Sequence, residues 1–147
     1  MKTTNEVKFV FLSHSSNEGF ARVAVSAFFA QLDPAADEIS DIKTAVSEAV
    51  TNCIVHAYRD NIGKIAVCAR ILQDNTVYIK ISDKGCGISD IKQAMEPAFT
   101  TDTTSERAGL GFAVMQSFMD KIKVWSKPEK GTTVVMTKKI NSRRSYD

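Results

Sequence analysis

Apolar and polar positions follow two different periods along the chain, and each change of period marks a predicted element. Val7–Leu12 is short, apolar and rich in β-prone residues, which predicts a first strand. Lys64–Leu72 and Thr76–Ser82 are also β-like, and the polar Gln73-Asp74-Asn75 between them predicts a hairpin. Near the end of the chain, two further strands, 122–126 and 132–140, flank a turn at 128–131.

Phe20–Leu32 has apolar residues at helical spacing on two sides of the predicted helix. One side carries Phe20, Val23 and Ala27, and the other carries Val25, Phe29 and Leu32. Two interpretations stay open, because such a helix is either buried on all sides or shared between the core and a partner subunit. Ser15 and Glu18, three residues apart, fit a capping box at its start.

A second helix is predicted from Asp33 and Pro34, as N-cap and first helical residue, to about Ala57. One apolar stripe at alternating three- and four-residue spacing supports it, formed by Ile39, Ile42, Val46, Ala49, Val50 and Cys53. A glycine-rich segment follows the hairpin at 83–89. A helical turn at 91–95, a Thr-rich loop at 99–108 and a helix at 109–119 complete the pattern.

The order strand, two helices, hairpin, loop, helix, two strands predicts an α+β fold. We expect a single domain over 1–147, with one mainly antiparallel or mixed sheet and the helices packed on one face. Residues 141–147 are expected to form a frayed polar tail.

Composition narrows the functional class. A net charge of +2, from 19 basic and 17 acidic residues, is too balanced to indicate a nucleic-acid partner. The chain lacks an apolar run that could span a membrane and a signal-peptide pattern. Three scattered cysteines without a C-x-x-C motif indicate reduced thiols in a cytoplasmic protein.

Three segments could carry chemistry together. Glu48, Asn52 and His56 are spaced i, i+4, i+8 and lie on one helical face, where a carboxamide can bind Mg²⁺ and a carboxylate can accept a proton. Alone, this pattern is also typical of a solvated helix face. Asp83-x-Gly85-x-Gly87 follows a strand, where glycines allow close approach of a flat ligand, although a tight turn explains them equally well.

The third segment is Gly109-Leu110-Gly111 at a helix start, where free N–H groups bind phosphate, with Arg107 just upstream. Gly131-Thr132 before the last strand is a weaker signal. The G-x-x-x-x-G-K-[ST] motif of P-loop proteins is absent, as are the H-R-D and D-F-G signatures of the large protein kinases.

In this combination the chain resembles the ATP-binding superfamily of gyrase, Hsp90, histidine kinases and MutL. It is most similar to the small serine kinases that act as bacterial anti-sigma factors. The resemblance spans roughly residues 5–140 and includes the segments 20–23, 30–34, 46–52 and 118–120.

The resemblance implies ATP or ADP with Mg²⁺ as cofactors, and a role for each matching residue. Glu48 and Arg107 are the expected catalytic residues, as general base and as γ-phosphate contact, and Asn52 is the expected Mg²⁺ ligand. Asp83 would accept a hydrogen bond from the adenine amine. The remaining expected ATP-binding residues are Gly85, Gly87, Thr100, Thr101, Gly109, Leu110, Gly111 and Thr132, with 99–108 as a lid.

The family also implies partners: a sigma factor of the sporulation sigma-F type, an anti-anti-sigma factor as the protein substrate, and a second copy in a homodimer. Arg22 is the expected partner contact, although a solvated surface arginine explains it equally well. Three other interpretations remain, namely a nucleotide-dependent sigma-binding module with vestigial kinase activity, a histidine-kinase catalytic half, and an interaction domain without nucleotide. The histidine-kinase interpretation is disfavoured, because only about 15 residues precede the first helix.

Overall fold

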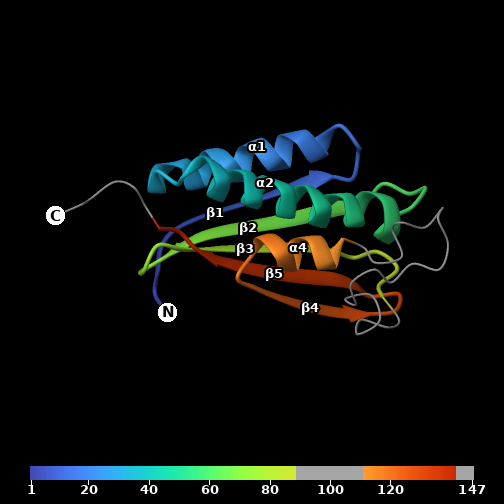
Figure 1. Ribbon diagram of the computed structural model, residues 1–147. Helices are drawn as coiled ribbons and strands as arrows, with labels where there is room; N and C mark the ends of the chain where they lie inside the picture. The colour runs from blue at the N-terminus through green and yellow to red at the C-terminus, as the bar shows by residue number, and fades with distance from the viewer. Residues whose placement is uncertain (89–110, 142–147) are drawn as a thin grey trace.

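Five strands form one antiparallel sheet in the computed structural model, which describes residues 1–88 and 111–141 (Figure 1). The strands are β1 (Thr3–Leu12), β2 (Lys64–Leu72), β3 (Thr76–Asp83), β4 (Lys121–Lys127) and β5 (Gly131–Lys139). Their spatial order is β1-β2-β3-β5-β4, and all four neighbouring pairs are antiparallel. The hairpin predicted between β2 and β3 is confirmed.

The helices lie on one face of this sheet, as Figure 1 shows, which confirms the predicted α+β class. They are α1 (Asn17–Phe29), the short 3-10 segment η1 (Ala30–Leu32), α2 (Ala36–Thr51), the π-helical segment η2 (Asn52–Ala57) and α4 (Phe112–Phe118). The middle helix, α2, packs against both α1 and α4. In the described part of the chain, no helix is long and apolar enough to cross a membrane.

The core lies between the sheet and α2, because strand residues alternate between the two faces. On β2 and β3 the buried inward positions are Ile65, Val67, Ala69, Ile71, Val77, Ile79 and Ile81. On α2 the predicted stripe supplies Ile42, Val46, Ala49 and Val50, all at most 1% exposed. The apolar period of the sequence therefore identified the core face of this helix correctly.

Only one of the two apolar sides of α1 is buried within a single chain. Val25 and Phe29 are fully buried, whereas Phe20 and Val23 are 54% and 61% exposed. The interpretation of α1 as a helix buried on all sides is therefore wrong for the single chain. The exposed side is available for a partner.

Both predicted helix caps are wrong. The N-cap of α1 is Ser16, which makes no side-chain cap hydrogen bond. Glu18 accepts a hydrogen bond from Ser47 Oγ and pairs with Arg22 instead of completing a capping box with Ser15. Asp33 adopts a left-handed conformation (φ 51°) at the end of η1. The start of α2 is held by Glu38, whose two oxygens accept the N–H groups of Ala35 and Asn141, each at 2.8 Å.

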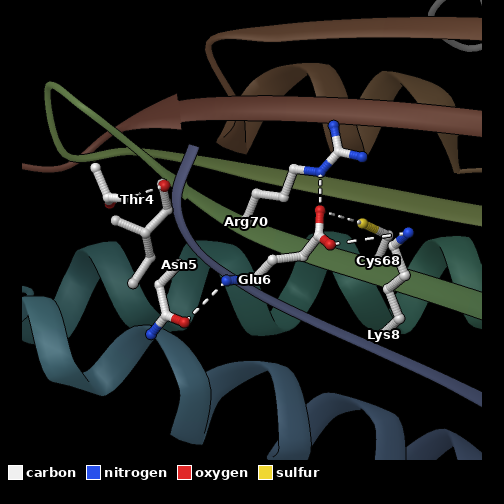
Figure 2. A network of polar contacts seen from close by, with 7 residues as sticks. Thr4, Asn5, Glu6, Lys8, Cys68 and Arg70 are labelled. Atoms are coloured by element: carbon white, nitrogen blue, oxygen red, sulfur yellow. Dashed lines mark hydrogen bonds and ion pairs between the residues drawn. The ribbon is translucent and has the colours of Figure 1, made fainter. Parts of the chain in front are cut away.

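The first strand is four residues longer than predicted because its start pairs through polar side chains. Figure 2 shows Glu6 on β1 accepting a hydrogen bond from Arg70 of β2, next to the thiol of Cys68. Lys8 lies 3.8 Å from the same carboxylate. Because these contacts are polar, the hydrophobic pattern that predicted the strand could not detect them.

Candidate functional site

A cavity of about 230 Å³ opens between the C-terminal end of the α2–η2 helix and the sheet. Its lining combines three of the expected ligand-binding side chains, Asn52, Asp83 and Thr132, with the backbone of Gly87. Apolar walls come from Ile81, Ile88, Phe112 and Val134. Segments that are far apart in the sequence therefore meet at one hollow with mixed polar and apolar character.

Asp83 is the only carboxylate among the described residues that line this cavity, and it is buried at 8% exposure. Its Oδ1 accepts hydrogen bonds from the N–H of Gly85 at 2.9 Å and the N–H of Thr132 at 3.3 Å. Burial raises the pKa of this carboxyl, while the hydrogen bonds from Gly85, the Cys53 thiol and Thr132 lower it in part. The strand end thus holds a desolvated acceptor whose orientation is set by the backbone.

The glycines after Asp83 let the turn pack tightly between two parts of the chain. A Cβ atom at Gly85 would lie 2.4 Å from the carbonyl oxygen of Ala57. Gly87 has φ +75°, and a Cβ there would lie 2.0 Å from the carbonyl oxygen of Lys127. The glycines are therefore required by the protein's own backbone, in addition to any approach of a ligand.

Further contacts hold this turn against the end of the helix. Cys86 donates its N–H to Ala57 at 3.0 Å, and its thiol lies 3.2 Å from the carbonyl oxygen of His56. The hydroxyl of Tyr58 donates to the Lys64 carbonyl and accepts the Lys84 N–H at 2.8 Å. Both residues tie the turn to η2 and to the start of β2.

The helix that carries Asn52 changes its hydrogen-bond pattern at that residue. From Asn52 to Ala57 it is π-helical, and the Tyr58 N–H bonds back five residues to Cys53 at 3.1 Å. Asn52 and His56 both line the cavity from this segment. A π-helical turn inside a longer helix often occurs at functional sites. The sequence predicted the helix to Ala57 correctly but did not indicate its change of pitch.

Glu48 lies one turn before Asn52, outside the cavity lining and beside Gly111. A Cβ atom at Gly111, which has φ +67°, would lie 2.3 Å from Glu48 Oε2. Burial raises the pKa of the Glu48 carboxyl. The Glu48 carboxylate therefore lies next to the start of α4. The two could not act at one site without this proximity.

Several expected site residues lie outside the described residues. These are Thr100, Thr101, Arg107, Gly109 and Leu110, together with the predicted lid at 99–108 and helical turn at 91–95. Their roles stay predictions. The same holds for the predicted tail beyond residue 141.

Three residues of the site were missed by sequence reasoning. Cys53 appeared only as part of an apolar stripe, yet its thiol bonds to Asp83. Tyr58 and Ser126 carry no motif, and their hydroxyls act only through tertiary contacts. A polar residue at an inward position of β4, such as Ser126, was the one signal available, since its neighbours Ile122 and Val124 at the same period are apolar.

A family model described as a histidine kinase-like ATPase domain matches residues 15–138. An anti-sigma F factor of Caldanaerobacter subterraneus subsp. tengcongensis is 57% identical over 144 residues, covering 98% of this chain and 100% of that protein. The chain belongs to the anti-sigma F factors of the histidine kinase-like ATPase family. A second anti-sigma F factor, from Bacillus subtilis (strain 168), is 47% identical over 142 residues, covering 96% and 97% of the two chains.

Solved structures support the same fold for this anti-sigma F family member. The RsbU and RsbW domains of Rv1364c from Mycobacterium tuberculosis match with a TM-score of 0.66 and 18% identity, over 93% of this chain and 33% of that chain. The catalytic domain of the histidine kinase ThkA matches with a TM-score of 0.57 and 18% identity, over 93% and 97%. At these identities the likeness shows the fold alone.

Proposed function

We propose that the chain is an ATP-dependent protein-serine kinase that also binds and inhibits a sporulation sigma factor in the cytoplasm. Its substrate would be a serine of an anti-anti-sigma factor. The single observation that carries the nucleotide part is the buried Asp83 carboxylate in the wall of a cavity that Asn52 of η2 also lines. The names of the relatives, which are anti-sigma F factors, support the sigma-factor part.

Both the polar and the apolar walls of the cavity suit a nucleotide base. Asp83 can accept a hydrogen bond from an exocyclic amine, and Ile81, Ile88 and Val134 offer apolar contacts to a flat ring. ADP would fit this part of the site as well as ATP does, because the two share the base.

Asn52 fits a Mg²⁺ ion that is held mainly by phosphate and water. Among the described residues, no three His, Cys, Asp or Glu side chains gather into a metal site. Mg²⁺ in phosphoryl-transfer sites usually takes one or two protein oxygens and keeps its water and phosphate ligands. The amide oxygen of Asn52 would be such a ligand.

Phosphoryl transfer requires a base and a positioned hydroxyl. Bound Mg·ATP supplies the phosphoryl group and the charge neutralisation of a loose transition state. The serine oxygen would form the new P–O bond as the bond to the ADP oxygen breaks, and Glu48 would accept the serine proton. The raised pKa of Glu48 favours this role, because a base is most effective when its pKa approaches the working pH. Arg107 would contact the γ-phosphate.

Partner binding is supported by an apolar surface formed by β1 and α1, which we call the β1–α1 patch. Its exposed members are Phe20 and Val23 of α1, and Phe20 packs edge-on against the half-buried Phe9 of β1 with ring centroids 5.7 Å apart. Contiguous exposed apolar residues mark interaction surfaces. We assign this patch to a homodimer contact. Arg22, between Phe20 and Val23 in sequence and paired with Glu18 at 3.5 Å, would contact the sigma factor at its border.

The test combines the chain with Mg²⁺, γ-labelled ATP and a candidate anti-anti-sigma factor. We expect label on a serine of that protein, and no transfer by the Asn52→Ala variant. Nucleotide binding without transfer would instead support the alternative, a nucleotide-dependent sigma-binding module with vestigial kinase activity. Co-purification with the sigma factor, read by the mass of the complex, tests the second activity, and failure to form a complex would contradict it.

A further inference from the structure

The face of the sheet that turns away from the helices carries a groove of about 530 Å³ over β3, β5 and β4 (Figure 1). Its apolar lining includes Leu72, Tyr78, Val135 and Trp125. Trp125 is 54% exposed, and tryptophan is enriched in protein interfaces because its large ring offers much contact area. Successive strand residues point to opposite faces, so the sheet separates this groove from the nucleotide cavity, which the neighbouring Val134 lines.

Lysines surround the groove on the same face. The outward positions of β3, β4 and β5 have no acidic residue, and they carry Lys80, Lys121, Lys123, Lys127 and Lys139. In the strand register, Val135 pairs with Lys80 on one side and with Lys123 on the other. The two lysines therefore stand two strand spacings, about 10 Å, apart with an apolar residue between them.

Four of these five lysines lack a charge partner. In the part of the chain that the structure describes, only Lys139 forms an ion pair, with Asp74 at 3.6 Å. Asp120, the other carboxylate in the lining, accepts the backbone N–H of Lys139 at 2.7 Å. Both carboxylates are thus held at the Lys139 end of the groove. We call Trp125 and the four unpaired lysines around it the Trp125–lysine face.

The charge of the chain is therefore divided unequally between its faces. The whole chain has 19 basic and 17 acidic residues, so the lysines of this face leave the remainder with a net negative charge. A second copy would present the same positive face here and be repelled, which argues against self-association through it. A negatively charged partner is attracted instead.

We propose that the Trp125–lysine face docks an acidic segment of a partner protein, with an apolar side chain of that segment against Trp125 and its carboxylates beside the lysines. Nucleic acid suits the face less well, because sheets that bind single strands stack successive bases on several aromatic rings. The Arg70 guanidinium covers the Tyr78 ring, 4.8 Å from its centroid. Trp125 is then the one exposed aromatic ring among the described residues of this face.

Trp125 is the single tryptophan of the chain, so its fluorescence reports on this face directly. The probe is a short synthetic peptide of glutamates around a central leucine, titrated into the full chain at about 0.15 M salt. We expect saturable binding with a blue shift of the emission, weaker binding when alanine replaces the leucine, and no shift with a lysine-based peptide. Absence of saturable binding would overturn the inference. Equally tight binding of oligothymidylate would overturn the assignment to a protein segment.

A pair of charge reversals tests whether the face itself binds the peptide. Lys123→Glu should weaken binding of the glutamate–leucine peptide about fivefold, as for the loss of one favourable exposed ion pair. Lys43→Glu makes the same change on an exposed residue of α2, on the helix side of the sheet, and should leave the affinity nearly unchanged. Equal effects of the two variants would show that only net charge matters and would overturn the inference. Lys121→Glu repeats the test if Lys123→Glu does not fold, and ATP binding should persist in all three variants.

Discussion

At the scale of single residues, Asp83 shows how the fold prepares an acceptor. The N–H groups of Gly85 and Thr132 orient its carboxylate, and burial removes it from water. Asp83→Asn keeps the shape but replaces one acceptor oxygen by a donor that opposes the adenine amine. We expect ATP to bind at least about tenfold more weakly. Calorimetry would measure this, with Asp74→Asn in the outer β2–β3 turn as the control. Equal affinity would remove Asp83 from base recognition.

Glu48 is the residue on which catalysis would depend. Glu48→Gln keeps the size of the side chain but cannot accept a proton, so we expect ATP binding to persist and phosphotransfer to be lost. Burial raises the pKa of Glu48, so the protonated, inactive form appears at a higher pH than for an ordinary glutamate. As the pH is lowered, the rate of wild-type phosphotransfer should therefore begin to fall at a correspondingly higher pH. Transfer at a near-normal rate by the variant would exclude Glu48 as the base.

The same shift predicts a pH-dependent stability with a definite sign. A carboxyl whose folded pKa is raised stabilises the fold while it is protonated, and this contribution is lost as pH rises through the folded pKa. Glu48→Gln should therefore raise the melting temperature near neutral pH, with the gain vanishing in acid. Glu6→Gln provides the opposite control, because the hydrogen bond from Arg70 lowers the pKa of Glu6. A loss of stability at neutral pH in Glu48→Gln would contradict this account.

At the scale of elements, the turn after β3 depends on close backbone contact. Gly87→Ala would force a side chain into a left-handed residue and against the Lys127 carbonyl, so we expect destabilisation of more than about 1 kcal/mol. Chemical denaturation would measure it. Gly19→Ala in α1 is the matched control, because its Cβ would meet only the Arg22 side chain at 3.8 Å. That change should be neutral or stabilising.

Elements with a regular apolar period were predictable, whereas their ends and irregularities were not. The stripe on α2 and the alternation on β2 and β3 report burial directly, since burial follows the period of the element. The cap of α1 was mispredicted because Glu18 bonds to Ser47, far along the chain. The start of α2 was mispredicted because Asp33 ends η1 in a left-handed conformation, and Glu38 holds the N–H groups of Ala35 and the remote Asn141. The π-helical turn at η2 lies where the helix packs against Cys86, a contact absent from local sequence.

At the scale of the whole molecule, the β1–α1 patch predicts the assembly state. Val23 is 61% exposed, and a charge there would have to be buried in a dimer contact. We therefore expect Val23→Glu to convert a dimer into a monomer in light scattering. Trp125→Glu is the control, because Trp125 is comparably exposed but lies on β4, at the opposite edge of the sheet from β1. A wild-type chain that is monomeric at micromolar concentration would contradict the assignment.

From the sequence we could identify only those residues of the candidate site whose type and spacing indicate a chemical role. The residue types and spacing of Asn52, Asp83, Gly87 and Thr132 singled them out, and the structure brings these four to one cavity. Tyr58 and Ser126 could not be found in this way. Their hydroxyls have no local partner in the motifs and act only across strands and turns that folding brings together.

The sequence by itself determined the fold class, the order of the elements and the buried face of α2, because apolar periodicity expresses the free energy of burial locally. It also specified membership of the family through its motifs. Only the tertiary structure decided which side of α1 stays exposed, how the turn after Asp83 docks on η2, and which hydroxyls stand behind Thr132. These features depend on distances between segments remote in sequence, and no local pattern contains that information.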